Sequence, residues 1–246
     1  MTADAHRSHQ AGRFGQRAQR QERTELACAG RVVAVKLMTV PNRWNEINWD
    51  DPRPELLEVI ASWESIAWEP VPVNAPALER YLVQVAATHL NGGYLFGRWC
   101  AVDYSDTTAW FLARNRLEEY ELLRIFFDSK AVRAGLSELQ IPKPLGRDVG
   151  GFQEHWAGSL CLDGLLAGAI VNGGAHERYR GPARDAKALA SAAVEALTQN
   201  RFEDFRMDVS HEAWAPWFEG VVFDQTYVLT DTANAEITVL CITDTS

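Results

Sequence analysis

Two carboxylates near the C-terminus, Asp224 and Asp244, are the residues of this 246-residue chain whose types and spacing best fit acid–base chemistry. Two carboxylates that lie close together can titrate at different pH values, or they can bind a hard cation such as Mg²⁺. Together with His211, they would form the catalytic site of a hydrolase or nuclease-like enzyme. The alternative is that both are solvated acids at the end of a hairpin, near a chain terminus that frays.

The chain lacks the sequence signatures of the commonest hydrolases and nucleotide-binding proteins. It contains no Gly-x-Ser-x-Gly elbow, Walker A loop or Gly-x-Gly-x-x-Gly segment. The His176-Glu177 and His211-Glu212 pairs do not extend to the His-Glu-x-x-His motif of zinc proteases. The four cysteines are widely spaced, and none has a sequence context typical of a nucleophile (Cys28, Cys100, Cys161 and Cys241). We therefore expect no metal and no cofactor, and we favour a function without catalysis.

Two tryptophans, Trp214 and Trp217, flank Pro216 in a loop between two expected strands. Large aromatic side chains on loops are good binding anchors when they are exposed. They also commonly plug the open end of a small sheet. Trp214 and Trp217 are therefore expected either to contact a partner or to fill the open end of the sheet.

An Asn-Gly-Gly turn follows each of two apolar, helix-like segments, at Asn91 and at Asn172. Asn and Gly are the residues that most readily end a helix, so helix termination is the favoured interpretation. The alternative is that these turns form backbone nests for an anion. The helix followed by Asn91-Gly92-Gly93 is similar to a feature of bacterial immunity proteins, over these few residues alone.

The expected fold class is α+β, with a small C-terminal antiparallel sheet packed on one face by several helices. Residues 203–210, 221–230 and 236–243 alternate between apolar and polar side chains, which predicts a three-strand meander. Its apolar faces align when Leu229 pairs with Ile237 and Tyr227 with Val239. This register buries Phe205 and Phe223 and brings Asp224 and Asp244 together on the polar face. Strands expected over residues 31–38 and 94–104 would extend the sheet.

Two domain boundaries are expected. The first thirty residues carry a net charge of +2 and little apolar surface, so we expect residues 1–29 to be a disordered basic tail. A basic arm that touches RNA or a membrane is the alternative interpretation of this segment. Residues 30–246 are expected to form a single α+β domain, with a sub-domain boundary near 140–151, where proline and glycine concentrate.

The favoured function is that of a cytoplasmic, acidic protein that binds a basic partner protein, for example one of the immunity or antitoxin kind. The chain carries a net charge of −9, which disfavours nucleic-acid binding. The apolar stretches are too short to cross a membrane, and the cysteine spacing is typical of a reducing compartment. The alternation predicts one acidic, solvent-facing side of the sheet. We expect this side and the two loop tryptophans to bind the partner. The residues expected at the binding site are Asp204, Asp208, Trp214, Trp217, Asp224 and Glu236. The oligomeric state stays open.

Overall fold

A computed structural model describes residues 46–146 and 149–246 of the chain. Within them, one antiparallel sheet of six strands has the order β1-β2-β6-β5-β4-β3. The strands are β1 (Ala67–Pro70), β2 (Gly93–Asp103), β3 (Gln153–Glu154), β4 (Phe205–Ser210), β5 (Gln225–Asp231) and β6 (Glu236–Thr243). The expected meander is present as β4, β5 and β6, and the expected strand 94–104 extends it as β2. The strand expected at 31–38 and the tail 1–29 lie outside the described residues.

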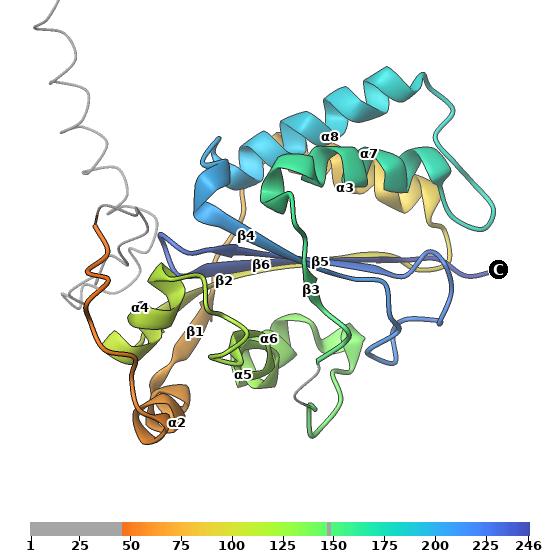
Figure 1. Ribbon diagram of the computed structural model, residues 1–246. Coiled ribbons are helices and arrows are strands. Elements are labelled where there is room, and N and C mark those ends of the chain that lie inside the picture. Colours follow the sequence, from red (N-terminus) through yellow and green to blue (C-terminus); the bar gives the residue numbers. More distant parts are fainter. Residues whose placement is uncertain (1–45, 147–148) are drawn as a thin grey trace, which may run out of the picture. The chain divides into compact units, whose positions relative to one another are not determined.

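Helices cover both faces of this sheet, which corrects the expectation that they pack on one face. Figure 1 shows α3, α7 and α8 on one side and α2, α4, α5 and α6 on the other. The helices are α2 (Leu56–Ser65), α3 (Pro76–Thr88), α4 (Asp106–Ala113), α5 (Leu122–Asp128), α6 (Lys130–Gly135), α7 (Leu162–Asn172) and α8 (Ala183–Thr198). Short 3-10 turns occur at Ser137–Leu139, Gly158–Cys161 and Phe202–Asp204. The α+β class is therefore confirmed, with a larger sheet and two helical layers.

A separate hydrophobic core fills each side of the sheet. On one side, Tyr227, Leu229, Leu240 and Ile242 pack against α3, α7 and α8. In α8, the residues at helical spacing that face this core are fully or almost fully buried: Ala186, Ala190, Ala193, Val194 and Leu197. Because the opposite face of the sheet is covered as well, seven of the eight residues of β6 are buried.

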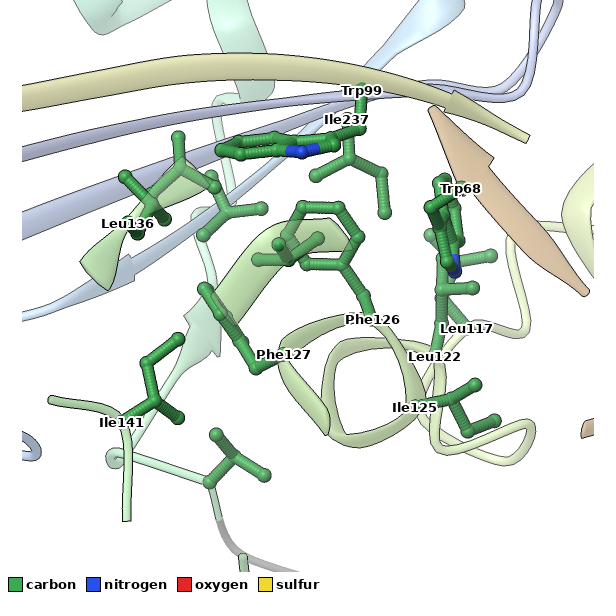
Figure 2. Packing of buried hydrophobic residues seen from close by; sticks show 14 of the residues in the cluster. Trp68, Trp99, Leu117, Leu122, Ile125, Phe126, Phe127, Leu136, Ile141 and Ile237 are labelled. Carbon is green, nitrogen blue, oxygen red and sulfur yellow. The ribbon is translucent and has the colours of Figure 1, made fainter. Parts of the chain in front are cut away.

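The core on the other side combines aromatic and aliphatic side chains, as Figure 2 shows. Trp99 lies flat beneath the sheet over Gly97, where an added Cβ atom would collide with the indole ring. The ring of Phe126 packs edge-on against both Trp68 and Trp99, with centroid distances of 5.0 and 5.5 Å. Edge-to-face geometry at these distances is favourable for aromatic pairs. α5 is thereby fixed against the sheet, and the turn before α5 carries part of the site described below.

The hairpin between β5 and β6 has a register one residue different from the predicted one. Leu229 pairs with Thr238 rather than Ile237, and Tyr227 pairs with Leu240 rather than Val239. The prediction assumed that only one face is buried, so that all apolar residues must share it. In the structure Val228 and Val239 pair on the opposite face from Tyr227 and Leu229. A two-sided core removes the constraint from which the predicted register was derived.

Both Asn-Gly-Gly turns follow helices in the structure. α3 ends at Thr88, and Gly93 at the start of β2 has a φ of 79°. α7 ends at Asn172, and Gly173 donates its N–H to the carbonyl of Ala169 with a φ of 70°. This geometry agrees with helix termination. In the part of the chain that the structure describes, no helix has the length and apolar character needed to span a bilayer.

Candidate functional site

Asp224 and Asp244, the carboxylate pair expected from the sequence, lie on opposite faces of the sheet. Thr243 donates its hydroxyl to Asp224, whose Oδ2 also accepts the N–H of Gly220 at 2.7 Å. Asp244 accepts the backbone N–H groups of Asn91 and Ala175, both at 2.7 Å, on the side of α3 and α7. Both carboxylates are almost completely buried and hold loops in place. The expected pairing was wrong because it depended on the register corrected above.

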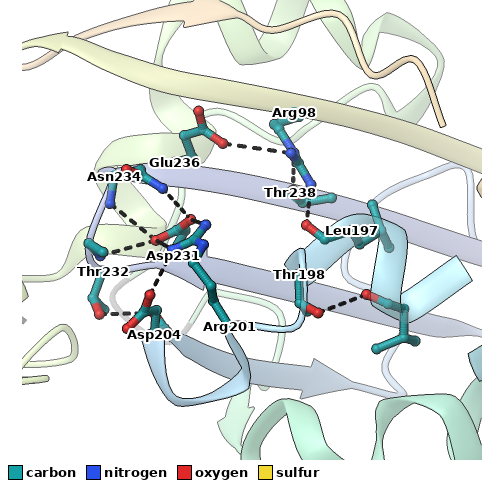
Figure 3. Close-up of polar contacts among 12 residues, drawn as sticks. Arg98, Leu197, Thr198, Arg201, Asp204, Asp231, Thr232, Asn234, Glu236 and Thr238 are labelled. Carbon is teal, nitrogen blue, oxygen red and sulfur yellow. Dashed lines mark hydrogen bonds and ion pairs between the residues drawn. The ribbon is translucent and has the colours of Figure 1, made fainter. Parts of the chain in front are cut away.

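Asp204 and Glu236 are balanced by arginines at the hairpin end of β5 and β6, as Figure 3 shows. Arg201 pairs with Asp204 at 2.8 Å, and Arg98 lies 3.7 Å from Glu236. Arg201 also pairs with the buried Asp231, whose carboxylate caps the turn through the N–H groups of residues 233 and 234. The expected acidic sheet face is therefore wrong: Asp208 and Asp224 are buried, and Asp204 and Glu236 are paired with arginines. The acids also do not share one face, because Arg98, the partner of Glu236, donates to the carbonyl of Leu197 in α8, whereas Asp208 lies in a cleft beside α5.

Trp214, Trp217 and His211, the other residues expected at a site, do not lie together with the two aspartates. Trp214 is half-buried, donates Nε1–H to Thr226 at 3.0 Å and packs against Phe127 with a centroid distance of 4.9 Å. It therefore plugs the end of the aromatic core. Trp217 is half-buried, and the centroid of its ring lies 5.1 Å from that of Phe218. His211 is exposed on the loop after β4, whereas Asp224 and Asp244 are buried.

A cleft with acidic walls lies at the β3–β4 edge of the sheet, beside the start of α5. Its volume is about 450 Å³. The described residues that line it include five apolar side chains, four carboxylates and two arginines: Leu117, Leu122, Leu123, Val149 and Phe152; Glu118, Glu121, Glu154 and Asp208; Arg124 and Arg206. The charges of these described residues sum to −2. An apolar floor with a negatively charged wall distinguishes this cleft from an ordinary surface hollow.

Arg206 is the centre of the charged wall. Its side chain is 4% exposed, and its guanidinium group contacts three carboxylates. Nη2 donates to Asp208 Oδ1 at 2.7 Å and to Glu118 Oε1 at 2.9 Å, while Nη1 lies 3.0 Å from Glu154 Oε2. Arg206 and Asp208 are two positions apart on β4, so both point to the same face of the sheet. Three carboxylates therefore surround one positive charge.

Burial and charge have opposing effects on the pKa values of this buried pair. Burial lowers the pKa of the Arg206 guanidinium, but the hydrogen bonds and charges of Asp208, Glu154 and Glu118 together more than offset this, so the pKa is raised. Burial raises the pKa of the Asp208 carboxyl group, and the bonds from Arg206 offset only part of that effect. The nearby charges of Glu154 and Glu118 raise it further. The excess negative charge thus has an energetic cost within the site.

The two rim carboxylates are held by well-anchored segments. Glu118 lies on the turn before α5, two residues before Tyr120. The buried hydroxyl of Tyr120 contacts the hydroxyls of Ser62 at 2.9 Å and Thr108 at 2.7 Å. Glu154 lies on β3, directly opposite Asp208 of β4. Like charges opposite each other destabilise a strand pair, and Arg206 offsets that repulsion. Glu118 and Glu154 are 74% and 42% exposed, so both reach solvent.

Sequence reasoning found Asp208 and missed its partners Arg206, Glu118 and Glu154. The one signal for this site was Arg206 itself, an arginine at an alternate position of a strand, but its partners are 88 and 52 residues away. The site can attract a cation because its carboxylates outnumber its arginines. Among the described residues, no group of three or more His, Cys, Asp or Glu side chains is arranged to hold a metal ion.

Comparisons with protein-family models, with curated proteins and with solved structures found no match for this chain. The functional argument therefore depends on the geometry and charge of the cleft.

Proposed function

We propose that this protein binds a basic partner protein, and that the acidic cleft takes an arginine or lysine side chain of that partner. The observation that carries the proposal is the combination of an apolar floor with carboxylates Glu118 and Glu154 at the exposed rim. Lysine and arginine have an apolar stem and a charged end, and they bury the stem while the charge stays at the rim. The cleft is complementary to both parts.

The net charge of the chain supports the same partner class. A charge of −9 attracts cationic proteins over a distance and accelerates their association at low salt. The proposed site lies at the β3–β4 edge of the sheet, not on the sheet face expected from the sequence, and the proposed partner is again a basic protein. We place the interaction in the cytoplasm, because four widely spaced cysteines are typical of a reducing compartment.

The test uses an acetylated tetra-arginine peptide as a probe for the basic side chain. Binding to the wild-type protein and to a Glu118→Gln/Glu154→Gln variant is measured by calorimetry. Glutamine keeps an oxygen acceptor for Arg206 but removes the negative charge. We expect the variant to bind about tenfold more weakly, from roughly 0.7 kcal/mol for each rim charge.

The matched control is Glu79→Gln/Glu195→Gln, which removes two exposed charges from α3 and α8 in the other helical layer. Both variants have the same net charge, so non-specific attraction changes equally in the two. Equal weakening by the two variants would refute the cleft as the binding site. Loss of binding in the cleft variant alone supports it.

A further inference from the structure

A thiol and an imidazole lie together on the side of β3 that faces away from the cleft. The Sγ atom of Cys161 is 3.2 Å from Nδ1 of His155. Glu154 points into the cleft, and the next residue, His155, reaches Cys161 at the beginning of α7 in the other helical layer. Successive side chains of an extended segment point in opposite directions, which separates this pair from the cleft.

The contacts of His155 define which nitrogen can accept a proton. The backbone N–H of Ala157 points at Nδ1 with a distance of 3.3 Å. An N–H group can donate only to an unprotonated nitrogen, so the proton of the neutral ring is on Nε2. The Cys161 thiol has two acceptors within reach, Nδ1 at 3.2 Å and the carbonyl of Gly158 at 3.4 Å, and rotation about its C–S bond directs the proton to Nδ1. This is the arrangement of a nucleophile and its general base.

The loop between the two residues holds them in this position. Gly158 donates its N–H to the carbonyl of His155 at 2.8 Å and has a φ of 54°, which reverses the chain. Ser159 is buried and donates its hydroxyl to the carbonyl of Phe202 at 2.9 Å. The chain then enters α7 with Cys161 as its N-cap residue.

Cys161 differs from the buried cysteines of the sheet. Cys241 is completely buried, and burial raises the pKa of its thiol to about 12. Cys161 is half-exposed. Burial raises the pKa of the Cys161 thiol and Asp163 raises it further, while its own backbone N–H and Lys187 lower it. The thiol is therefore protonated at neutral pH and depends on a neighbouring base to become a nucleophile.

Two exposed apolar side chains flank the pair. Trp156 is 93% exposed and follows His155, and Leu160 is 72% exposed and precedes Cys161. Neither side chain contributes to a core of the described residues. Large exposed apolar residues beside a polar pair are typical of a contact site for an apolar group. They would lie next to a molecule that approaches the sulfur.

We propose that Cys161 and His155 form a nucleophilic site that takes an apolar acyl group from an activated carboxylic ester. Cys161 Sγ attacks the carbonyl carbon, and its proton moves to His155 Nδ1. The S–C bond forms as the bond between the carbonyl carbon and the leaving oxygen breaks. The proton then passes from Nδ1 to the leaving oxygen, which departs as an alcohol or phenol, and Cys161 carries a thioester.

The experiment treats the full chain with p-nitrophenyl butyrate, follows p-nitrophenol release and maps the butyryl group by peptide mass spectrometry. We expect the wild-type protein to acquire one butyryl group on the peptide that contains Cys161. Cys161→Ser should lose this adduct. His155→Ala should acquire it at least tenfold more slowly, as expected for loss of a general base. Trp156→Ala should acquire it about threefold more slowly at low ester concentration, through loss of apolar contact area.

The matched control is His176→Ala, which removes an exposed histidine on the loop after α7 and should react as the wild type does. Circular dichroism checks that each variant is folded. The comparison within the wild-type protein needs no variant: equal butyrylation of the peptides that contain Cys28, Cys100, Cys161 and Cys241 would overturn the proposal. An unchanged rate in folded His155→Ala would overturn it as well.

Discussion

Arg206 is the residue on which the cleft most depends, because its guanidinium group lies among three carboxylates and its side chain is almost completely buried. Breaking a buried ion pair leaves an uncompensated charge, which is far more costly than the net contribution of the intact pair. We predict that Arg206→Met lowers the free energy of unfolding by about 3–5 kcal/mol. The measurement is guanidinium denaturation at pH 7.

The matched variant for this prediction is Arg206→Met/Asp208→Leu, which removes both buried charges. We expect it to be more stable than Arg206→Met alone, because no unpaired carboxylate is left in the interior. A single variant as stable as the wild type would contradict the ion-pair geometry described here.

His89 makes the stability of the fold dependent on pH. Burial lowers the pKa of its imidazole, and Asp244 and the carbonyl of Val85 offset only part of this effect. Below about pH 6.5 the imidazole of His89 is therefore protonated more fully in the unfolded chain than in the folded chain. The free energy of unfolding should fall with decreasing pH from that point, with a contribution from His89 of at most about 1.4 kcal/mol per pH unit.

Above about pH 6.5 the imidazole is neutral in both states, so His89 adds no pH dependence there. His89→Gln should flatten the decline between pH 6.5 and pH 5, and His176→Gln, which changes an exposed histidine, should not. Denaturation curves at several pH values measure the two slopes. Identical slopes for wild type and His89→Gln would contradict the burial effect.

At the scale of elements, alternation predicted the strands well and their environment poorly. β2, β4, β5 and β6 begin and end within four residues of the predicted bounds. Alternation shows which side chains share a face, but it does not show whether the other face meets water or a second helical layer. The alternation therefore predicts that Asp204, Asp208, Asp224 and Glu236 face solvent, and the predicted register follows from a one-sided core. The charged wall depends on contacts between residues far apart in sequence, which local patterns do not contain.

A double-mutant cycle tests whether Asp224 and Asp244 lie on opposite faces of the sheet. Asp224 accepts charge-assisted hydrogen bonds from the loop before β5, and Asp244 accepts them from the segments that follow α3 and α7, so Asp224→Ala and Asp244→Ala should each cost about 2 kcal/mol of stability. The two have no hydrogen-bond partner in common, so the costs should add within about 0.5 kcal/mol. A coupling energy above about 1 kcal/mol would indicate the adjacent pair that the sequence analysis expected.

At the scale of the whole molecule, the sequence predicts that residues 2–28 are dispensable for folding. The segment carries basic charge and no periodic apolar face. Its deletion should leave the melting temperature nearly unchanged in a thermal scan. A loss of several degrees would show that the segment packs on the rest of the chain.

The most direct test of the acidic cleft is a titration of the ¹⁵N-labelled protein with the tetra-arginine peptide, followed by amide chemical shifts. If the peptide binds in the cleft, saturable chemical-shift changes should concentrate on residues 117–124, 153–154 and 206–208. The size of these changes at a given peptide concentration should decrease as salt is added. The Glu118→Gln/Glu154→Gln variant should need about tenfold more peptide to reach these shifts, and Glu79→Gln/Glu195→Gln should titrate as the wild type does. Shifts confined to α3 and α8, or spread evenly over the acidic surface, would contradict the assignment of the binding site to the cleft.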